Sequence, residues 1–140
     1  MLEFIHDFAS HFASQARVED VQSFDAVEAD LQTRLPADYK AFLMWADGGE
    51  TVPPVKRMKF YPLAELLPRR ADGQPTGTLE FATDDSSGFA FDLTVGRDGA
   101  SYPVVTYPLG DTTREDLELV AEEFRQFLQV IVDPGARYRR

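Results

Sequence analysis

The hydrophobic pattern of this 140-residue chain changes at the Gly48–Gly49 pair. Before the pair, apolar residues recur at steps of three and four, which is the spacing of one buried helical face. After it, apolar and polar residues alternate over 88–95, which is the period of a half-buried strand. Helices followed by strands with short connections predict an α+β fold with helices packed on an antiparallel sheet, because parallel strands need longer crossovers.

Three helices are expected before the glycines. Apolar spacing places the first over 2–16, and the second begins near Ser23, whose hydroxyl can cap its first turn. Pro36 interrupts the second helix and suits the first turn of a third, where Asp38 favours the positive end of the helix dipole. The third helix ends at the glycines, because glycine adopts the left-handed conformation at little cost.

The second half of the chain is expected to form strands and a closing helix. The strands are predicted over 58–61, 78–83, 88–95 and 102–107, with one helical turn at 63–67 and a hairpin turn at 96–99. Thr112 and Glu115 have the spacing of a capping box, and apolar residues from Leu117 to Ile131 recur at helical spacing. One long helix is therefore predicted there. The length suits one core, so we expect a single domain over residues 1–140.

Composition limits the classes of function. The chain has 24 Asp and Glu against 14 Lys and Arg, which gives a net charge of −10. Such a chain is poorly suited to nucleic acid or an anionic membrane, so neither is expected as a partner, whereas basic proteins are. The absence of cysteine excludes disulfides and thiolate chemistry. The N-terminal stretch is not typical of a signal peptide, and no apolar run could span a bilayer, so we expect a cytoplasmic protein.

Residues that carry catalysis are scarce. His6 and His11 are five apart in the expected first helix, whereas neighbours on a helix face are three or four apart. The chain contains no nucleophile elbow, phosphate loop or dinucleotide-binding glycine motif. Carboxylates for glycoside chemistry are plentiful, but nothing in the sequence sets their separation. We therefore expect no enzyme, and predict no catalytic residue, cofactor or metal ligand.

The segment at 84–88 has two interpretations. Asp84, Asp85 and the two serines that follow could supply oxygen ligands to a hard cation such as calcium. However, the alternating ligand pattern of calcium loops is missing, and Asp, Ser and Gly are also the residues of a tight turn between strands. The turn is the preferred interpretation.

The single tryptophan also has two interpretations. Trp45 lies one position beyond the apolar stripe of Tyr39 and Phe42, about a hundred degrees further round the helix. It could pack in the core or form an exposed aromatic anchor at an interface. The core is favoured, because most aromatic side chains at helix–sheet contacts are buried.

Acidic residues crowd the expected strand region and the last helix. A solvated surface that keeps the protein in solution explains this pattern. A surface that steers a positively charged partner and raises its association rate explains it as well. On the second interpretation, the candidate partner-binding residues are Asp84, Asp85, Asp92, Glu118, Glu122 and Glu123. We expect the chain to be a monomer or a weak homodimer.

Three segments carry a specific pattern. Residues 35–43 read Leu-Pro-Ala-Asp-Tyr-Lys-Ala-Phe-Leu, and 47–49 read Asp-Gly-Gly. An acidic turn leads into an aromatic strand at 84–92, and 124–128 read Phe-Arg-Gln-Phe-Leu. Together they resemble the SUKH superfamily, which shows Leu-Pro-x-Asp-Tyr-x-x-Phe-Leu and then Asn-Gly-Gly, so that Asp47 replaces the usual Asn. The resemblance covers about residues 20–131.

The resemblance implies a curved antiparallel sheet with helices packed on one side, in agreement with the α+β pattern of the residues. It also implies a binding role without catalysis. Bacterial members typically act as immunity proteins that bind and neutralise a cognate toxin, often a nuclease, and nuclease toxins are often basic where they hold phosphate. The alternatives are an intracellular regulatory adaptor or scaffold of the Smi/Knr type and, more weakly, a small hydrolase that uses carboxylates.

Overall fold

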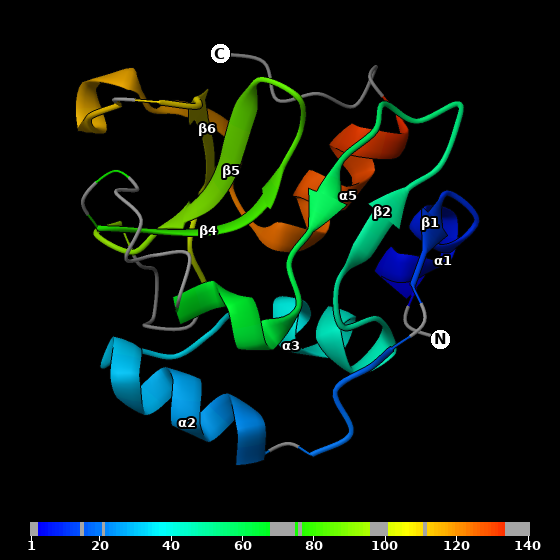
Figure 1. Ribbon diagram of the computed structural model, residues 1–140, viewed down its shortest axis with the longest axis horizontal. Helices are drawn as coiled ribbons and strands as arrows, with labels where there is room; N and C mark the ends of the chain where they lie inside the picture. The colour runs from blue at the N-terminus through cyan, green and yellow to red at the C-terminus, as the bar shows by residue number, and fades with distance from the viewer. Residues whose placement is uncertain are drawn as a thin grey trace.

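The computed structural model describes residues 3–14, 16–20, 22–67, 75, 77–95, 101–110 and 112–133. Within these ranges the helices are α1 (Glu3–Ala9), α2 (Gln22–Leu31), α3 (Ala37–Trp45) and α5 (Phe124–Val132), with short 3-10 turns at Leu63–Glu65 and Arg114–Asp116. The strands are β1 (Phe12–Ala13), β2 (Gly49–Thr51), β3 (Lys59–Phe60), β4 (Thr78–Thr83), β5 (Ser87–Asp92), β6 (Val104–Pro108) and β7 (Glu118–Ala121). The described residues form one α+β domain (Figure 1).

The strands form one open antiparallel sheet in which each strand pairs with the next along the sequence. Figure 1 shows β1 and β6 toward opposite ends of the sheet, and β7 follows β6 as the last strand. The register shifts by one residue at Phe81 in β4 and at Val120 in β7. Such bulges increase the local twist of a sheet and bend it. The predicted α+β fold with an antiparallel sheet is confirmed.

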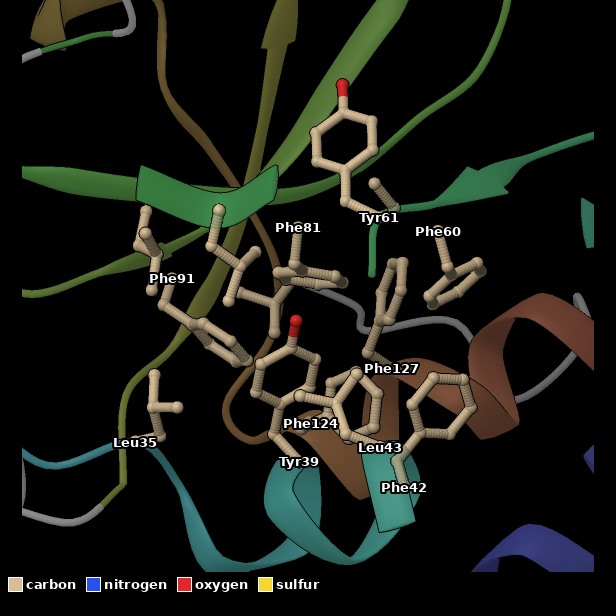
Figure 2. Close-up of a cluster of buried hydrophobic side chains, with 14 of the residues drawn as sticks. Leu35, Tyr39, Phe42, Leu43, Phe60, Tyr61, Phe81, Phe91, Phe124 and Phe127 are labelled. Carbon is tan, nitrogen blue, oxygen red and sulfur yellow. The ribbon is translucent and has the colours of Figure 1, made fainter. Parts of the chain in front are cut away.

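The helices join one aromatic core on one face of the sheet. In Figure 2 the rings of α3 and α5 meet those of the strands, and Tyr39 lies 5.1 Å from Phe91 and 5.0 Å from Phe124 between ring centroids. Phe42 and Phe124 are fully buried and 5.2 Å apart. Aromatic pairs at such distances add stabilisation beyond their buried area. The predicted buried face of the third helix is confirmed.

The N-terminus of α5 is capped from another helix. Asp38, in the first turn of α3, is buried, and its Oδ2 accepts a hydrogen bond of 3.0 Å from the backbone N–H of Arg125. The first N–H groups of a helix lack partners within it, and a carboxylate there also favours the helix dipole. Asp38 therefore ties α3 to α5 across 87 positions of sequence.

The opposite face of the sheet holds a small polar cluster. Glu80 is 7% exposed, and its two carboxylate oxygens accept hydrogen bonds from the hydroxyls of Tyr61, at 2.8 Å, and Tyr107, at 2.5 Å. A Cβ added to Gly88 would lie 2.3 Å from Glu80 Oε1, so only glycine leaves room for this cluster. Burial and the hydrogen bond to the Glu80 carboxylate raise the pKa of the Tyr107 hydroxyl well above its usual range.

The predicted closing helix is wrong in its first part. The capping box predicted for Thr112 and Glu115 is wrong by one residue, because Thr113 and Asp116 form it, and they do so in a 3-10 turn. Residues 118–121 then form β7, and α5 begins only at Phe124. The spacing of Leu117, Val120 and Ala121 fits a helix locally, but Glu118, Leu119 and Ala121 pair with β6, so the backbone of this segment belongs to the sheet.

The first two helices also differ from their predictions. The helix predicted over 2–16 ends at Ala9, and Phe12–Ala13 pairs with β2 instead. Ser23 lies inside α2 and does not cap it, whereas Asp20 Oδ1 accepts the N–H of Gln22 at 2.9 Å. Pro36 directly precedes α3, close to its predicted place in the first turn.

The strand predicted over 78–83 is confirmed with its boundaries. The other strands are confirmed in type, with ends that differ by a few residues, and a 3-10 turn occupies part of the predicted helical turn at 63–67. Gly48 has φ +83° and Gly49 has φ +148°, which supports their predicted role in the chain reversal after α3. The hairpin turn predicted at 96–99 lies outside the described residues.

Candidate functional site

The first two candidate residues lie in the turn between β4 and β5. Asp84 Oδ1 accepts the backbone N–H groups of Ser86, at 2.9 Å, and Ser87, at 2.7 Å, and its Oδ2 lies 3.2 Å from Lys56 Nζ. Partial burial alone would raise the pKa of Asp84, but the two N–H donors and the Lys56 ammonium hold that pKa below its usual value. The predicted tight turn is confirmed, and Asp85 is the exposed carboxylate of this turn.

Asp92 ends β5 and is engaged within the fold. Its side chain is 8% exposed, and Oδ2 lies 2.8 Å from Arg114 Nη2, while Oδ1 accepts the hydroxyl of Thr94 at 2.7 Å. Burial would raise the pKa of Asp92, but the hydrogen bonds from Arg114 and Thr94 outweigh it and lower that pKa. Asp92 thus fastens the 3-10 turn at Arg114–Asp116 to the sheet and leaves little of its carboxylate for a partner.

The other three candidates lie at the last strand of the sheet. Glu118 begins β7, and Glu122 and Glu123 lie between β7 and α5, with all three exposed. Glu123 lies 3.9 Å from Arg125 Nε, in a pair that is too exposed to contribute much to stability. The expectation that these glutamates belong to the last helix is wrong, because Glu118 lies in a strand and Glu122 and Glu123 lie in the turn before α5.

A groove of about 800 Å³ runs between α5 and the sheet next to β7. Its floor and walls are mainly apolar, with Leu119 and Val120 from β7 and Phe127 and Ile131 from α5. Polar residues line it as well, and they include Glu118, His11 and the ion-paired Asp84 and Lys56. The structure therefore brings two of the candidate carboxylates, 34 positions apart in sequence, into one groove.

A second hollow of about 400 Å³ lies on the other side of β7. It is lined by Asp92, Arg114 and Glu122 together with the apolar side chains of Val105 and Leu119. Leu119 thus borders both hollows, because the sheet ends at β7 and the hollows meet there. The structure brings Asp92 and Glu122 together here, apart from the groove that holds Asp84 and Glu118.

The two histidines lie at one surface hollow, which also includes Asp7 and Asp133. Because α1 ends at Ala9, the spacing of residues along a helix does not govern where His11 lies. Among the described residues, no group of three or more His, Asp or Glu is arranged to hold a metal ion. None of the described helices is long and apolar enough to cross a membrane.

Trp45 packs against the core and keeps part of its surface exposed. Its ring lies 5.7 Å from that of Phe42 and 5.8 Å from that of Phe12 between centroids. The favoured interpretation of Trp45 as a core residue is confirmed in part, since the side chain is only half-buried.

Sequence reasoning missed the residues that shape the groove. Both Leu119 and Val120 fell within the predicted closing helix, with Val120 on its buried face, so neither was expected at the edge of a sheet. The run of acidic residues interrupted by apolar ones at 115–123 was a usable signal, because it is unlike the polar face of a single amphipathic helix.

A family model for SMI1 / KNR4 family (SUKH-1) matches residues 20–130, which is most of the chain. The chain belongs to this SUKH-1 family. No curated protein matches the chain closely enough to count as a relative.

The SUKH-1 signature at 35–43 serves the fold. Leu35, Tyr39, Phe42 and Leu43 are at most 2% exposed and lie in the core. Asp47, at the position of the usual Asn, accepts the N–H of Leu63 at 2.7 Å through Oδ1. An Asn side chain offers the same acceptor oxygen, which explains why the exchange is tolerated. The signature therefore identifies the SUKH-1 scaffold, whereas the acidic edge at β7 lies outside it.

Proposed function

We propose that this chain is an immunity protein that binds a cognate bacterial toxin and blocks it without chemistry of its own. Membership of the SUKH-1 family is the observation that carries this proposal, since bacterial members resembling this chain typically have that role. Fold alone does not fix function, so the binding surface has to be argued from the residues.

The charge of the chain supports a basic partner. The segment 115–123 contains five carboxylates and no Lys or Arg, and the whole chain has a net charge of −10. A concentrated negative field raises the rate at which a positively charged protein associates. A nuclease toxin fits this chemistry, because the surface that holds phosphate is basic.

The exposure of the acidic residues favours the β7 edge as the surface that binds the partner. The carboxylate oxygens of Asp84 and Asp92 already accept hydrogen bonds and form ion pairs within the fold. Asp85, Glu118, Glu122 and Glu123 are exposed, so a partner can reach them from solvent. We therefore assign the toxin-binding surface to the β7 edge, with Asp85 at its margin, in a chain that acts in the cytoplasm as a monomer or a weak homodimer.

The test is co-expression with the product of the neighbouring gene, and a toxin encoded immediately upstream would favour the immunity function. Growth of cells that express the toxin should be restored by the chain, and the two proteins should co-purify as a complex. Failure of both rescue and complex formation contradicts the proposal. Turnover by the isolated chain would contradict its non-catalytic part, and co-purification with several unrelated host proteins would support an adaptor instead.

A further inference from the structure

β7 is an edge strand with an open side. It pairs with β6 alone, and no strand in the described ranges lies beyond it. Leu119 and Val120 are partly exposed to solvent, so the described residues cover this edge incompletely. An edge strand presents backbone N–H and C=O groups that an extended segment of another protein can take up.

Hollows lie on both faces of the sheet where it ends. The groove of about 800 Å³ borders β7 on the α5 face, and the hollow of about 400 Å³ borders it on the opposite face. Successive side chains of a strand point to opposite faces. A strand added beside β7 would therefore direct alternate side chains toward the two hollows, which is how such complexes gain specificity.

The residues that line the two hollows indicate which side chains of an added strand would fit there. The groove on the α5 face is mainly apolar, with Val120 and Ile131 among its walls. The opposite hollow contains the Asp92–Arg114 ion pair, whose charges offset each other, and the carboxylate of Glu122, so its lining residues carry a net negative charge. The matching segment therefore alternates apolar residues with Lys or Arg.

Charge also argues against a second copy of this chain as the occupant. Pairing of two β7 strands would bring the carboxylates of residues 115–123 in one copy close to the same five in the other. Like charges on directly opposed strands are destabilising. The occupant is therefore a basic segment of a different protein.

We infer that the β7 edge binds an extended segment of the partner in which apolar and basic residues alternate, and that this segment adds a strand to the sheet. The inference deepens the proposed function and rests on it for the identity of the partner as a toxin. The binding of such a segment can be measured without any toxin.

The probe is the acetylated and amidated hexapeptide Val-Lys-Val-Lys-Val-Lys, with Val-Glu-Val-Glu-Val-Glu as its charge-inverted counterpart. Titration into isotopically labelled full-length chain should shift the backbone amide signals of β7 and the groove, and the acidic peptide should shift none. Glu122→Lys, in the hollow assigned to the basic side chains, should weaken binding of the basic peptide about tenfold at low salt. The matched control is Asp30→Lys, which makes the same charge change on the exposed surface of α2 and should leave binding unchanged.

A second pair of peptides tests the backbone pairing. N-methylation at every other residue removes the N–H donors on one edge of the peptide while keeping its side chains and charge. Of the two alternating patterns, one should abolish binding and the other should preserve it. Equal binding of both patterns, or amide shifts confined to other elements, would overturn the added strand.

Toxin rescue separates this inference from the proposed function. Val120→Trp, which fills part of the groove, should lose both peptide binding and rescue while retaining the thermal melt of a folded chain. If Glu122→Lys and folded Val120→Trp both rescue as well as the parent, the β7 edge is not the toxin site and the inference fails. If the parent binds the peptide as described but rescues nothing, the immunity function fails and the strand-binding edge remains.

Discussion

The hydroxyl of Tyr39 is buried and has no hydrogen-bond partner among the described residues. Tyr39 is 1% exposed, and Figure 2 shows its hydroxyl pointing into the aromatic core, whereas the hydroxyl of Tyr61 points away from it. A buried hydroxyl without a partner costs about 1–3 kcal/mol. Tyr39→Phe keeps the ring and removes this cost, so it should raise the free energy of unfolding by about 1–3 kcal/mol.

Urea unfolding followed by the fluorescence of Trp45 measures this change, because the ring packs against Phe42 in the same core. For a chain of this size, each kcal/mol should move the melting temperature by about 3–5 °C. Tyr61→Phe is the matched control, since it removes a hydroxyl that donates to Glu80, and it should destabilise by about 1–2 kcal/mol. Tyr39→Ala should cost about 3–5 kcal/mol through the cavity it leaves. A loss of stability in Tyr39→Phe similar to that in Tyr61→Phe would refute the reasoning.

The same variant predicts a change at alkaline pH. Burial, with a contribution from the charge of Asp47, raises the pKa of Tyr39 in the folded chain well above its usual range. The unfolded chain releases this proton near pH 10, so stability is complete below about pH 10 and falls as the pH rises toward the folded pKa. Tyr39→Phe should therefore lose less stability than the parent between about pH 10 and pH 11.

Three further predictions concern the carboxylates. Asp38→Ala should lower the free energy of unfolding by about 2 kcal/mol, measured by urea unfolding, because it uncaps α5 at the N–H of Arg125; an unchanged midpoint would contradict this cap. Asp92→Asn should make the free energy of unfolding fall less steeply below about pH 4. The lowered pKa of Asp92 stabilises the fold above that pH, and this contribution is lost as the pH falls through the folded pKa. Identical acid unfolding curves of parent and variant would contradict this prediction. Charge reversal at Glu118, Glu122 and Glu123 should slow toxin association and reduce its salt dependence in stopped-flow measurements without changing the melting temperature. An unaltered association rate would place the interface elsewhere.

Local patterns predicted the elements whose determinants lie within them. The helix after Pro36 and the strand over 78–83 were predicted because capping, period and turn residues all agree there. The tight turn at Asp84 was predictable for the same reason, since its hydrogen bonds connect residues two and three positions apart. The candidate acidic residues were chosen from the positions where carboxylates crowd along the sequence, and their role in binding stays a prediction.

The amino-acid sequence by itself determined the α+β class, the aromatic core of α3 and the family, because each depends on residue types at short spacing. The tertiary structure decided that residues 118–121 form an edge strand, because their backbone groups pair with β6 and periodicity alone cannot supply that partner. It also decided which carboxylates are exposed. Asp92 is held by Arg114, 22 positions away, and Asp38 by Arg125, 87 positions away, and only the folded chain brings such groups together.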